Sequence, residues 1–272
     1  MKKTLYTVTL VLLVAVFAFS AFYVVNYMID SKAQKDEMAQ LQQMKEEAAA
    51  KATETTAPTE TAEAPATEET QETEPAGPTE PQILPDYSEL YKMNNDLSGW
   101  ITIAGTDIDY PVMQTPEEFD FYLKRNFGKE NSPHGCIFVG EGNDLETPSD
   151  NVTLYGHNML DGSMFAGLHK YTEKEKWEEN SLIIFNTLYE YHVYKIFAVF
   201  KTTASVDEGF KYHRFVNAEN EAEFNTFVNE CKRLSFYDTG ITPVYGDKII
   251  CLSTCEYTLT NGRLVVAAVR IS

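Results

Sequence analysis

The stretch DKIICLSTCEYTLTNGRLVVAAVRI, residues 247–271, decides the fold class of this chain. Two runs rich in apolar and β-branched residues, Asp247–Thr254 and Arg263–Ile271, flank a short loop that contains Asn-Gly. Asn-Gly between such runs is a strong local indication of a β-hairpin, because both residues tolerate the positive φ angles of tight turns. The predicted hairpin brings the thiol of Cys255 beside the guanidinium of Arg263 at one mouth of a sheet.

Short predicted strands continue upstream of this hairpin and are separated by turn residues. The other predicted strands are Gly99–Ile103, Ile108–Met113, Gly135–Val139, Asn151–Tyr155, Ser181–Asn186 and Glu190–Thr202. Helical spacing appears near residues 85–93, in a short stretch ending at His169, and in Ala218–Leu234. Strands and helices do not alternate regularly, which disfavours a parallel α/β fold. The pattern therefore predicts a mostly β barrel or sandwich of about eight strands with added helices.

The N-terminus predicts a membrane anchor. An uncharged run from Thr4 to Ile29 follows Lys2 and Lys3 and is longer than the ~20 residues that a membrane-spanning helix needs. A cleaved signal peptide is the alternative, but nine further apolar residues follow the possible cleavage site at Ser20. We therefore expect residues 1–30 to form a cytoplasmic tip and signal-anchor, with the rest of the chain outside the cell.

Composition divides the remaining chain into two parts. Residues 31–86 are dominated by Thr, Glu, Ala and Pro, with acids outnumbering bases 13 to 4, and are expected to be a disordered tether with one possible helical stretch at Lys35–Lys51. Residues 87–272 are long enough for one domain with a proper core. The net charge of −19 argues against binding nucleic acid or anionic lipid through a basic surface.

Four cysteines are present, at positions 136, 231, 251 and 255. Cys251 and Cys255 lie four apart on one predicted strand, about 13 Å if extended, which is too far for a disulfide. We expect Cys255 to be free at the strand end, and Cys136, Cys231 and Cys251 to be small buried residues.

A cysteine, a histidine and an arginine are the residues needed for cysteine acyl transfer. A thiolate is a strong nucleophile, and nearby positive charge lowers the thiol pKa from ~8.5. His157 follows a predicted strand and Gly156, and its imidazole can protonate a leaving amine. Arg263 can hydrogen-bond an oxyanion. His134 is the only serious competitor for the histidine; Arg270 lies about 23 Å further along its strand, on the opposite face.

Three ordered motifs resemble those of class B sortases, the membrane-anchored cysteine transpeptidases of Gram-positive bacteria. TLYGH (153–157) resembles the family's histidine motif, LSTC (252–255) its cysteine motif, and NGRLVV (261–266) its arginine strand. The resemblance covers roughly residues 87–272. It implies a closed β-barrel of about eight strands, with an N-terminal helix and an extra helix before the cysteine strand.

The resemblance also implies roles for individual residues. Cys255 would attack the Thr carbonyl of a C-terminal sorting signal in a secreted protein, Arg263 would stabilise the oxyanion, and His157 would protonate the leaving amine. A peptidoglycan-precursor amine or a pilin lysine would then resolve the thioester. Residues expected to line the substrate groove are Ser253, Thr254, Tyr155 and Glu256. No cofactor and no metal ion is implied, and the chain shows no evident counterpart of the calcium site of some class A sortases.

Two alternative functions are compatible with the same three residues. A cysteine peptidase would carry the same three residues and release the acyl-enzyme to water. A non-enzymatic anchored adhesin or scaffold would carry them by coincidence. Substitution of Cys255 and the response of turnover to added amines separate the three hypotheses.

Overall fold

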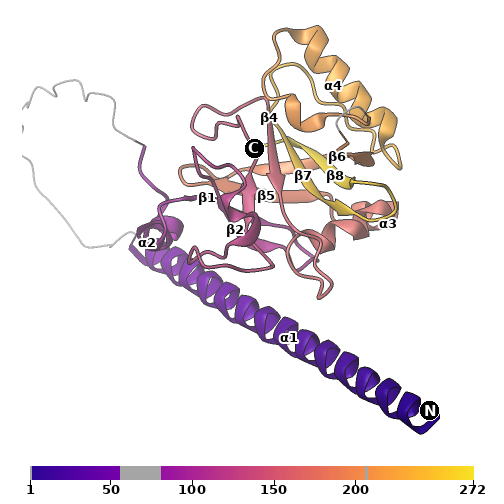
Figure 1. Cartoon of the computed structure of the whole chain (residues 1–272). Coiled ribbons are helices and arrows are strands. Elements are labelled where there is room, and N and C mark those ends of the chain that lie inside the picture. The colour runs from indigo at the N-terminus through magenta and orange to yellow at the C-terminus, as the bar shows by residue number, and fades with distance from the viewer. Residues whose placement is uncertain (1, 56–80, 206–207) are drawn as a thin grey trace, which may run out of the picture.

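The chain forms a closed eight-stranded β-barrel preceded by one long helix (Figure 1). The computed structural model describes residues 2–55, 81–205 and 208–272. In chain order the elements are α1 (Lys2–Thr55), α2 (Pro85–Met93), β1 (Leu97–Thr102), β2 (Asp109–Met113), η1 (Phe121–Lys124), β3 (Ile137–Val139), β4 (Asn151–Tyr155), η2 (Phe165–Thr172), α3 (Lys174–Glu179), β5 (Leu182–Thr187), β6 (Val193–Thr203), η3 (Tyr212–Arg214), α4 (Glu221–Leu234), β7 (Ile249–Glu256) and β8 (Gly262–Arg270). The predicted mostly β barrel with added helices is confirmed.

The strands follow one another around the barrel in the order β1-β2-β3-β4-β7-β8-β6-β5, and β5 pairs with β1 to close it. Closure excludes the alternative of a two-sheet sandwich. The pairs β2–β3 and β4–β7 are parallel, and the other neighbours are antiparallel. Because β4 and β7 run in the same direction, their C-terminal ends emerge at the same mouth of the barrel.

Two hydrophobic clusters hold the strands in place. The larger one fills the barrel, where alternate residues of β7 such as Ile250 and Leu252 point inward. The smaller one lies outside β6, β7 and β8, and the helix α4 covers it with Phe224 and Phe227. The prediction of a helix before the cysteine strand is therefore confirmed, with its start at Glu221.

The cysteines separate into two kinds. Cys136, Cys231 and Cys251 are buried, and burial raises the pKa of each thiol well above its ordinary value. Cys255 is partly exposed, and all four are free thiols. Cys251 and Cys255 share one strand and one face, and only Cys255 reaches the barrel mouth.

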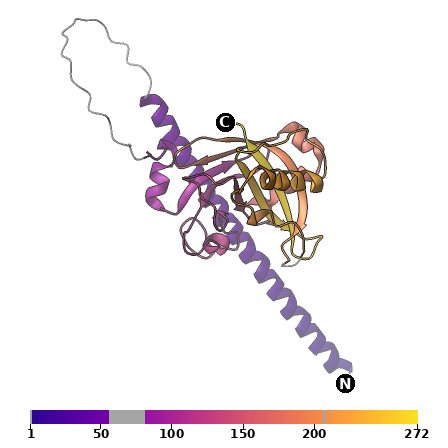
Figure 2. The ribbon, with the colours of Figure 1, turned by 90° about the horizontal axis from the view of Figure 1, so that it is seen from above.

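The helix α1 extends beyond the expected anchor. It continues without a break from Lys2 to Thr55, so it includes the possible helical stretch expected at Lys35–Lys51 and the residues on both sides of that stretch. The reason is tertiary packing: Met38 and Leu41 are buried in the main core beside α2. The remainder of the predicted tether as far as residue 80 lies outside the described residues. Figure 1 shows the N-terminal half of α1 standing clear of the barrel, and Figure 2 shows the barrel lying across the helix when seen from above.

Polar contacts join this helix to the barrel as well. Nζ of Lys45 lies 2.8 Å from a carboxylate oxygen of Asp109 and 4.3 Å from the ring centre of Trp100. The amide of Gln42 donates to the backbone carbonyl of Asp109 at 2.8 Å. Among the described residues, α1 is the one helix long and apolar enough to cross a membrane.

Candidate active site

The β7–β8 hairpin places a thiol opposite a guanidinium. Cys255 and Arg263 are direct partners in the antiparallel ladder, as the sequence predicted. The loop between them closes tightly because Asn261 adopts a positive φ of 52° and Gly262 has no room for a side chain. A Cβ atom on Gly262 would lie 2.3 Å from the carbonyl oxygen of Glu256. The loop geometry therefore brings the two side chains to the same mouth of the barrel.

The parallel pair β4–β7 brings His157 to the same mouth. Tyr155 is paired with Ser253, and His157 and Cys255 each lie two residues further along their chains. The backbone N–H of Gly156 donates to the carbonyl of Ser253 at 3.1 Å, which extends the pairing by one bond. A Cβ atom on Gly156 would lie 2.4 Å from Cδ1 of Ile137 and 2.7 Å from the ring of Phe165. Glycine is required here because of this close packing.

Side-chain hydrogen bonds continue the β4–β7 pairing where the backbone ladder stops. The hydroxyl of Thr254 donates to the carbonyl of Gly156 at 2.8 Å. The amide of Asn158 lies 3.1 Å from the carbonyl oxygen of Cys255 and 3.0 Å from Nε2 of His169, and its two hydrogens can serve both acceptors. Nε2 of His169 is itself 3.1 Å from that carbonyl oxygen, and it donates there in the tautomer in which it carries the hydrogen and does not accept from Asn158. These bonds hold the main chain next to His157 against the main chain of Cys255.

Asn158 and His169 were not predicted as site residues. Asn158 directly follows the histidine motif, and its position was the only available indication of a role. His169 was assigned to a helical stretch, and it lies in η2, a 3₁₀ helix. Its approach to Cys255 arises because η2 packs against β7 and β8. No local pattern indicates that contact.

The hydrogen-bond partner of His157 shows which of its ring nitrogens carries the hydrogen. Nε2 lies 2.7 Å from the carbonyl oxygen of Leu123 in η1. A carbonyl can only accept, so Nε2 carries the hydrogen. Within the described residues Nδ1 of His157 makes no hydrogen bond, which leaves it as the nitrogen available for proton transfer.

The guanidinium of Arg263 is held at the hairpin and surrounded by tyrosines. Its Nη1 donates to the carbonyl of Gly262 at 2.9 Å. Its charge opposes the rise in pKa that burial produces in Tyr155 and Tyr212; the pKa of Tyr155 is raised to about 12. Both phenols therefore remain protonated near neutral pH and can act as hydrogen-bond donors.

The four residues expected to line the substrate groove have different surroundings. Tyr155 is half-buried against Phe138. Ser253 is 1% exposed and its hydroxyl is 2.6 Å from the hydroxyl of Tyr212. Thr254 is 2% exposed and bonded as described above.

Glu256 turns into the hairpin loop. Its carboxylate lies 2.9 Å from Nζ of Lys201 and accepts hydrogen bonds from the hydroxyl of Thr258 at 2.8 Å and the N–H of Leu259 at 3.2 Å. Burial raises its pKa, but the bonds from Lys201 and Thr258 outweigh that effect and lower the pKa to about 2. The carboxylate is thus ionised at neutral pH and ties the loop to β6.

The two rival residues lie elsewhere. His134 is fully buried under α1, with Nε2 at 3.5 Å from a carboxylate oxygen of Asp161. Arg270 is at the far end of β8, paired with Tyr194. The register therefore places Arg263, and not Arg270, opposite the thiol.

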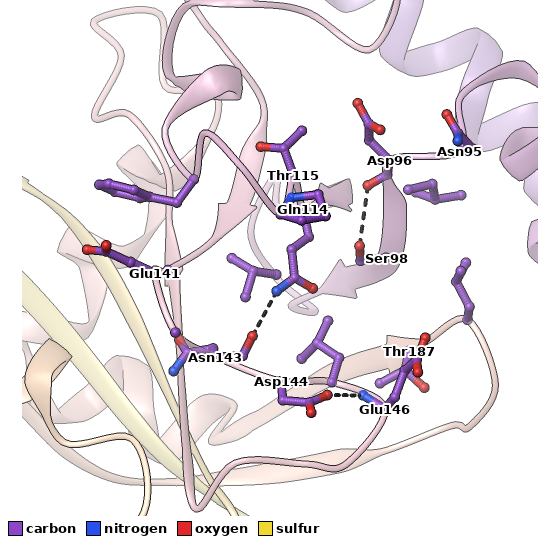
Figure 3. Close-up of a pocket in the computed structure, with 18 of the residues that line it drawn as sticks. Asn95, Asp96, Ser98, Gln114, Thr115, Glu141, Asn143, Asp144, Glu146 and Thr187 are labelled. Carbon is purple, nitrogen blue, oxygen red and sulfur yellow. Dashed lines mark hydrogen bonds between the residues drawn. The ribbon is translucent and has the colours of Figure 1, made fainter.

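A pocket of about 640 Å³ opens at the opposite mouth of the barrel (Figure 3). Residues that line it include Asp96, Ser98, Gln114, Glu141, Asn143, Asp144 and Glu146. It lies where β3 ends and β4 begins, whereas Cys255 lies where β4 and β7 end. Within the part of the chain that the structure describes, no group of three or more His, Cys, Asp or Glu side chains is placed to hold a metal ion.

A mixed β-barrel with a cysteine, a histidine and an arginine at one mouth is the arrangement expected of a cysteine transpeptidase of the sortase type. The family model described as "Sortase domain" matches residues 101–271. The chain belongs to the sortase family, and its similarity to sortases B assigns it to class B.

Two relatives and one solved structure document this similarity. Sortase B of Staphylococcus aureus (strain NCTC 8325 / PS 47) is 34% identical over 70% of this chain and 76% of its own length. Sortase B of Listeria monocytogenes serovar 1/2a is 33% identical over 68% of this chain and 74% of its own length. A Staphylococcus aureus sortase B–substrate complex superposes with a TM-score of 0.73 at 28% identity, covering 90% of this chain and 99% of that chain.

Proposed function

We propose that this cysteine transpeptidase cleaves a C-terminal sorting signal of secreted proteins after Thr and transfers the acyl group to an amine of the cell wall or of a pilin lysine. The observation that carries the proposal is the convergence of Cys255, Arg263 and His157 through two strand registers. The similarity to a Staphylococcus aureus sortase B that was solved as a substrate complex supports a substrate site on this barrel.

The proposed chemistry has two steps. In the reactive form the thiol of Cys255 has passed its proton to Nδ1 of His157, which leaves a thiolate and an imidazolium. The thiolate attacks the carbonyl carbon of Thr, Arg263 hydrogen-bonds the oxyanion, and the C–N bond breaks as His157 gives its Nδ1 proton to the leaving amine. An incoming amine then attacks the thioester, returns a proton to His157 and releases the thiolate. The hydrogen bond from Nε2 to Leu123 keeps the ring oriented throughout.

We assign different tasks to the four predicted groove residues. Tyr155, which is half-buried beside Arg263, is proposed to line the groove. Ser253, Thr254 and Glu256 are proposed to position the nucleophile strand, since their side chains are bonded within the protein.

The proposed location is the outer face of the cell membrane. The apolar part of α1 would cross the bilayer once, with Lys2 and Lys3 on the cytoplasmic side and the barrel outside. The membrane, the sorting-signal protein and the amine donor are then the proposed partners.

Substitution of the nucleophile tests the proposal. Cys255→Ala in the full-length protein should lower cleavage of sorting peptides by on the order of a thousandfold or more, with little change in thermal stability. The matched control is Cys251→Ala, on the same strand and face but buried in the smaller cluster. Full cleavage by Cys255→Ala would exclude this cysteine as the nucleophile.

Added amine distinguishes transfer from hydrolysis. Triglycine or hydroxylamine should raise turnover and appear in the product if the thioester is resolved by an amine. If the product remains the free acid at every amine concentration, the protein acts as a cysteine peptidase on that substrate.

A further inference from the structure

The apolar helix α1 packs directly on the core of the barrel through Met38 and Leu41. The helix α1 runs from Lys2 to Thr55, and its uncharged run ends at Ile29. A continuous helix rises 1.5 Å per residue, so each barrel contact on α1 has a definite height above the bilayer. The 26 residues from Thr4 to Ile29 span about 39 Å, close to the thickness of a bilayer with its headgroups.

The barrel contacts of α1 that lie nearest to its apolar run are made by loops at the mouth that holds Cys255. The hydroxyl of Ser31 donates to the carboxylate of Asp161, four residues after His157. Nζ of Lys35 is 3.9 Å from the same carboxylate. The ring of Tyr27 stacks on the ring of His134, which precedes β3, at 6.2 Å. Residues 27–35 of α1 therefore touch the loops before β3 and after β4, both at the mouth that holds Cys255.

The loop after His157 presents an apolar tip to its surroundings. The N–H of Gly162 donates to the carbonyl of Met159 at 3.1 Å and closes a turn with Leu160 and Asp161 at its centre. Asp161 faces α1, whereas Leu160 is 94% exposed. The loop is therefore tied to α1 directly above the end of the apolar run, with a large apolar side chain unpartnered.

We propose that the turn formed by residues 159–162 contacts the outer leaflet of the membrane, with Leu160 in the lipid interface and the catalytic mouth opening at the bilayer surface. The bilayer is the occupant because the span of α1 brings it to the height of Tyr27 and Ser31. A mouth at this height favours substrates that are themselves held at the membrane surface.

This inference rests on the proposed anchoring by α1 and not on the proposed chemistry. Nitroxide labels would be placed on the full chain in Cys255→Ala, where the other cysteines are buried, after insertion into nanodiscs of 3:1 phosphatidylcholine and phosphatidylglycerol. Leu160→Cys is the test position. Val244→Cys, 62% exposed at the opposite mouth, is the matched control, and Phe17→Cys, 75% exposed, reports the span. All three side chains are exposed, so labelling leaves the core intact.

Power-saturation EPR compares the access of oxygen, which enriches in lipid, with that of an aqueous nickel chelate. We expect labels at 17 and 160 to favour oxygen, the one at 160 less strongly, and the label at 244 to favour the chelate. If the labels at positions 160 and 244 are equally accessible to the chelate while the label at position 17 is in lipid, the inference is overturned and the proposed anchoring by α1 stands. Chelate access at 17 would overturn both.

Discussion

Two side chains outside the predicted triad hold the nucleophile in place. The amide of Asn158 and the imidazole of His169 both approach the backbone carbonyl of Cys255 at 3.1 Å. Neither group needs to touch the substrate to affect the reaction. A displacement of about 1 Å between reacting groups can cost on the order of a hundredfold in rate. Asn158 is therefore a positioning residue. It follows His157 directly in the chain, and its amide bonds the backbone carbonyl of Cys255.

Asn158→Ala should lower kcat about 10- to 100-fold with little change in KM, and should cost about 1 kcal/mol of stability. Steady-state kinetics and thermal denaturation would measure the two effects. The control is Asn180→Ala, whose amide donates to the carbonyl of Ala104 at 2.8 Å, away from the site. Equal losses of kcat in both variants would assign Asn158 a purely structural role.

The Glu256 carboxylate predicts a pH-dependent contribution to stability. Its pKa is lowered to about 2 in the folded protein, against about 4.3 for an unfolded glutamate. A lowered pKa means that the stabilisation is present above the unfolded value and is lost as the pH falls toward about 2. Glu256→Gln should therefore be less stable than the wild type at pH 7, and the difference should shrink between about pH 4.5 and 2.

Denaturant unfolding measured across that range would test this expectation. Glu219→Gln is a suitable control, because Glu219 is exposed and lies outside the hairpin. A stability difference that stays constant from pH 7 to pH 2 would show that the charge of Glu256 is not responsible.

At the scale of elements, the turn from β4 into η2 is the most constrained connection in the site. The N–H of Phe165 donates to the carbonyl of His157 at 2.8 Å, so η2 begins against the histidine. Gly156 lets Ile137 and Phe165 approach the backbone more closely than any side chain would permit. The position of His157 thus depends on packing between β3, β4 and η2.

Gly156→Ala should destabilise the protein by about 1–3 kcal/mol and lower kcat as well, since the added methyl group must displace β4 from Ile137 and Phe165. Gly128→Ala is the control, because a Cβ atom there meets its nearest neighbour at 3.5 Å. Its stability should stay within about 0.5 kcal/mol of the wild type. Unchanged kcat and melting temperature in Gly156→Ala would contradict the packing argument.

For the whole molecule, the main consequence is that α1 and the barrel form one packed unit. Leu41 is 2% exposed and Met38 is 6% exposed, both within the main core. Lys45 adds an ion pair with Asp109, in which the pKa of the aspartate is lowered because the bonds from Lys45 and Trp100 outweigh its burial. The helix α1 therefore holds the barrel in one orientation relative to its own axis.

Leu41→Ala should weaken this docking by about 2 kcal/mol. Hydrogen exchange of the full-length protein in nanodiscs would show faster exchange in residues 31–52 and in α2. Gln43→Ala, at an exposed position on the same helix turn, should exchange like the wild type. Equal exchange in Leu41→Ala and the wild type would mean that Leu41 does not hold α1 on the barrel.

Local patterns in the sequence determined the β7–β8 hairpin, the apolar N-terminal helix and α4. Alternating apolar residues and the Asn-Gly turn specify β7 and β8, and that hairpin alone sets Cys255 opposite Arg263. The uncharged N-terminal run specifies a helix that can span a membrane, because length and apolar character suffice for that property. Helical spacing likewise specifies α4.

Tertiary structure decided what depends on residues far apart in the chain. The parallel pairing of β4 with β7 joins His157 to Cys255 across nearly 100 residues, and no local preference encodes the partner of a strand. The packing of residues 31–55 on the barrel depends on burying Met38 and Leu41, which their polar sequence neighbours conceal. Asn158 and His169 meet Cys255 only when the barrel closes, and Asp161 meets Ser31 only when α1 packs on the barrel.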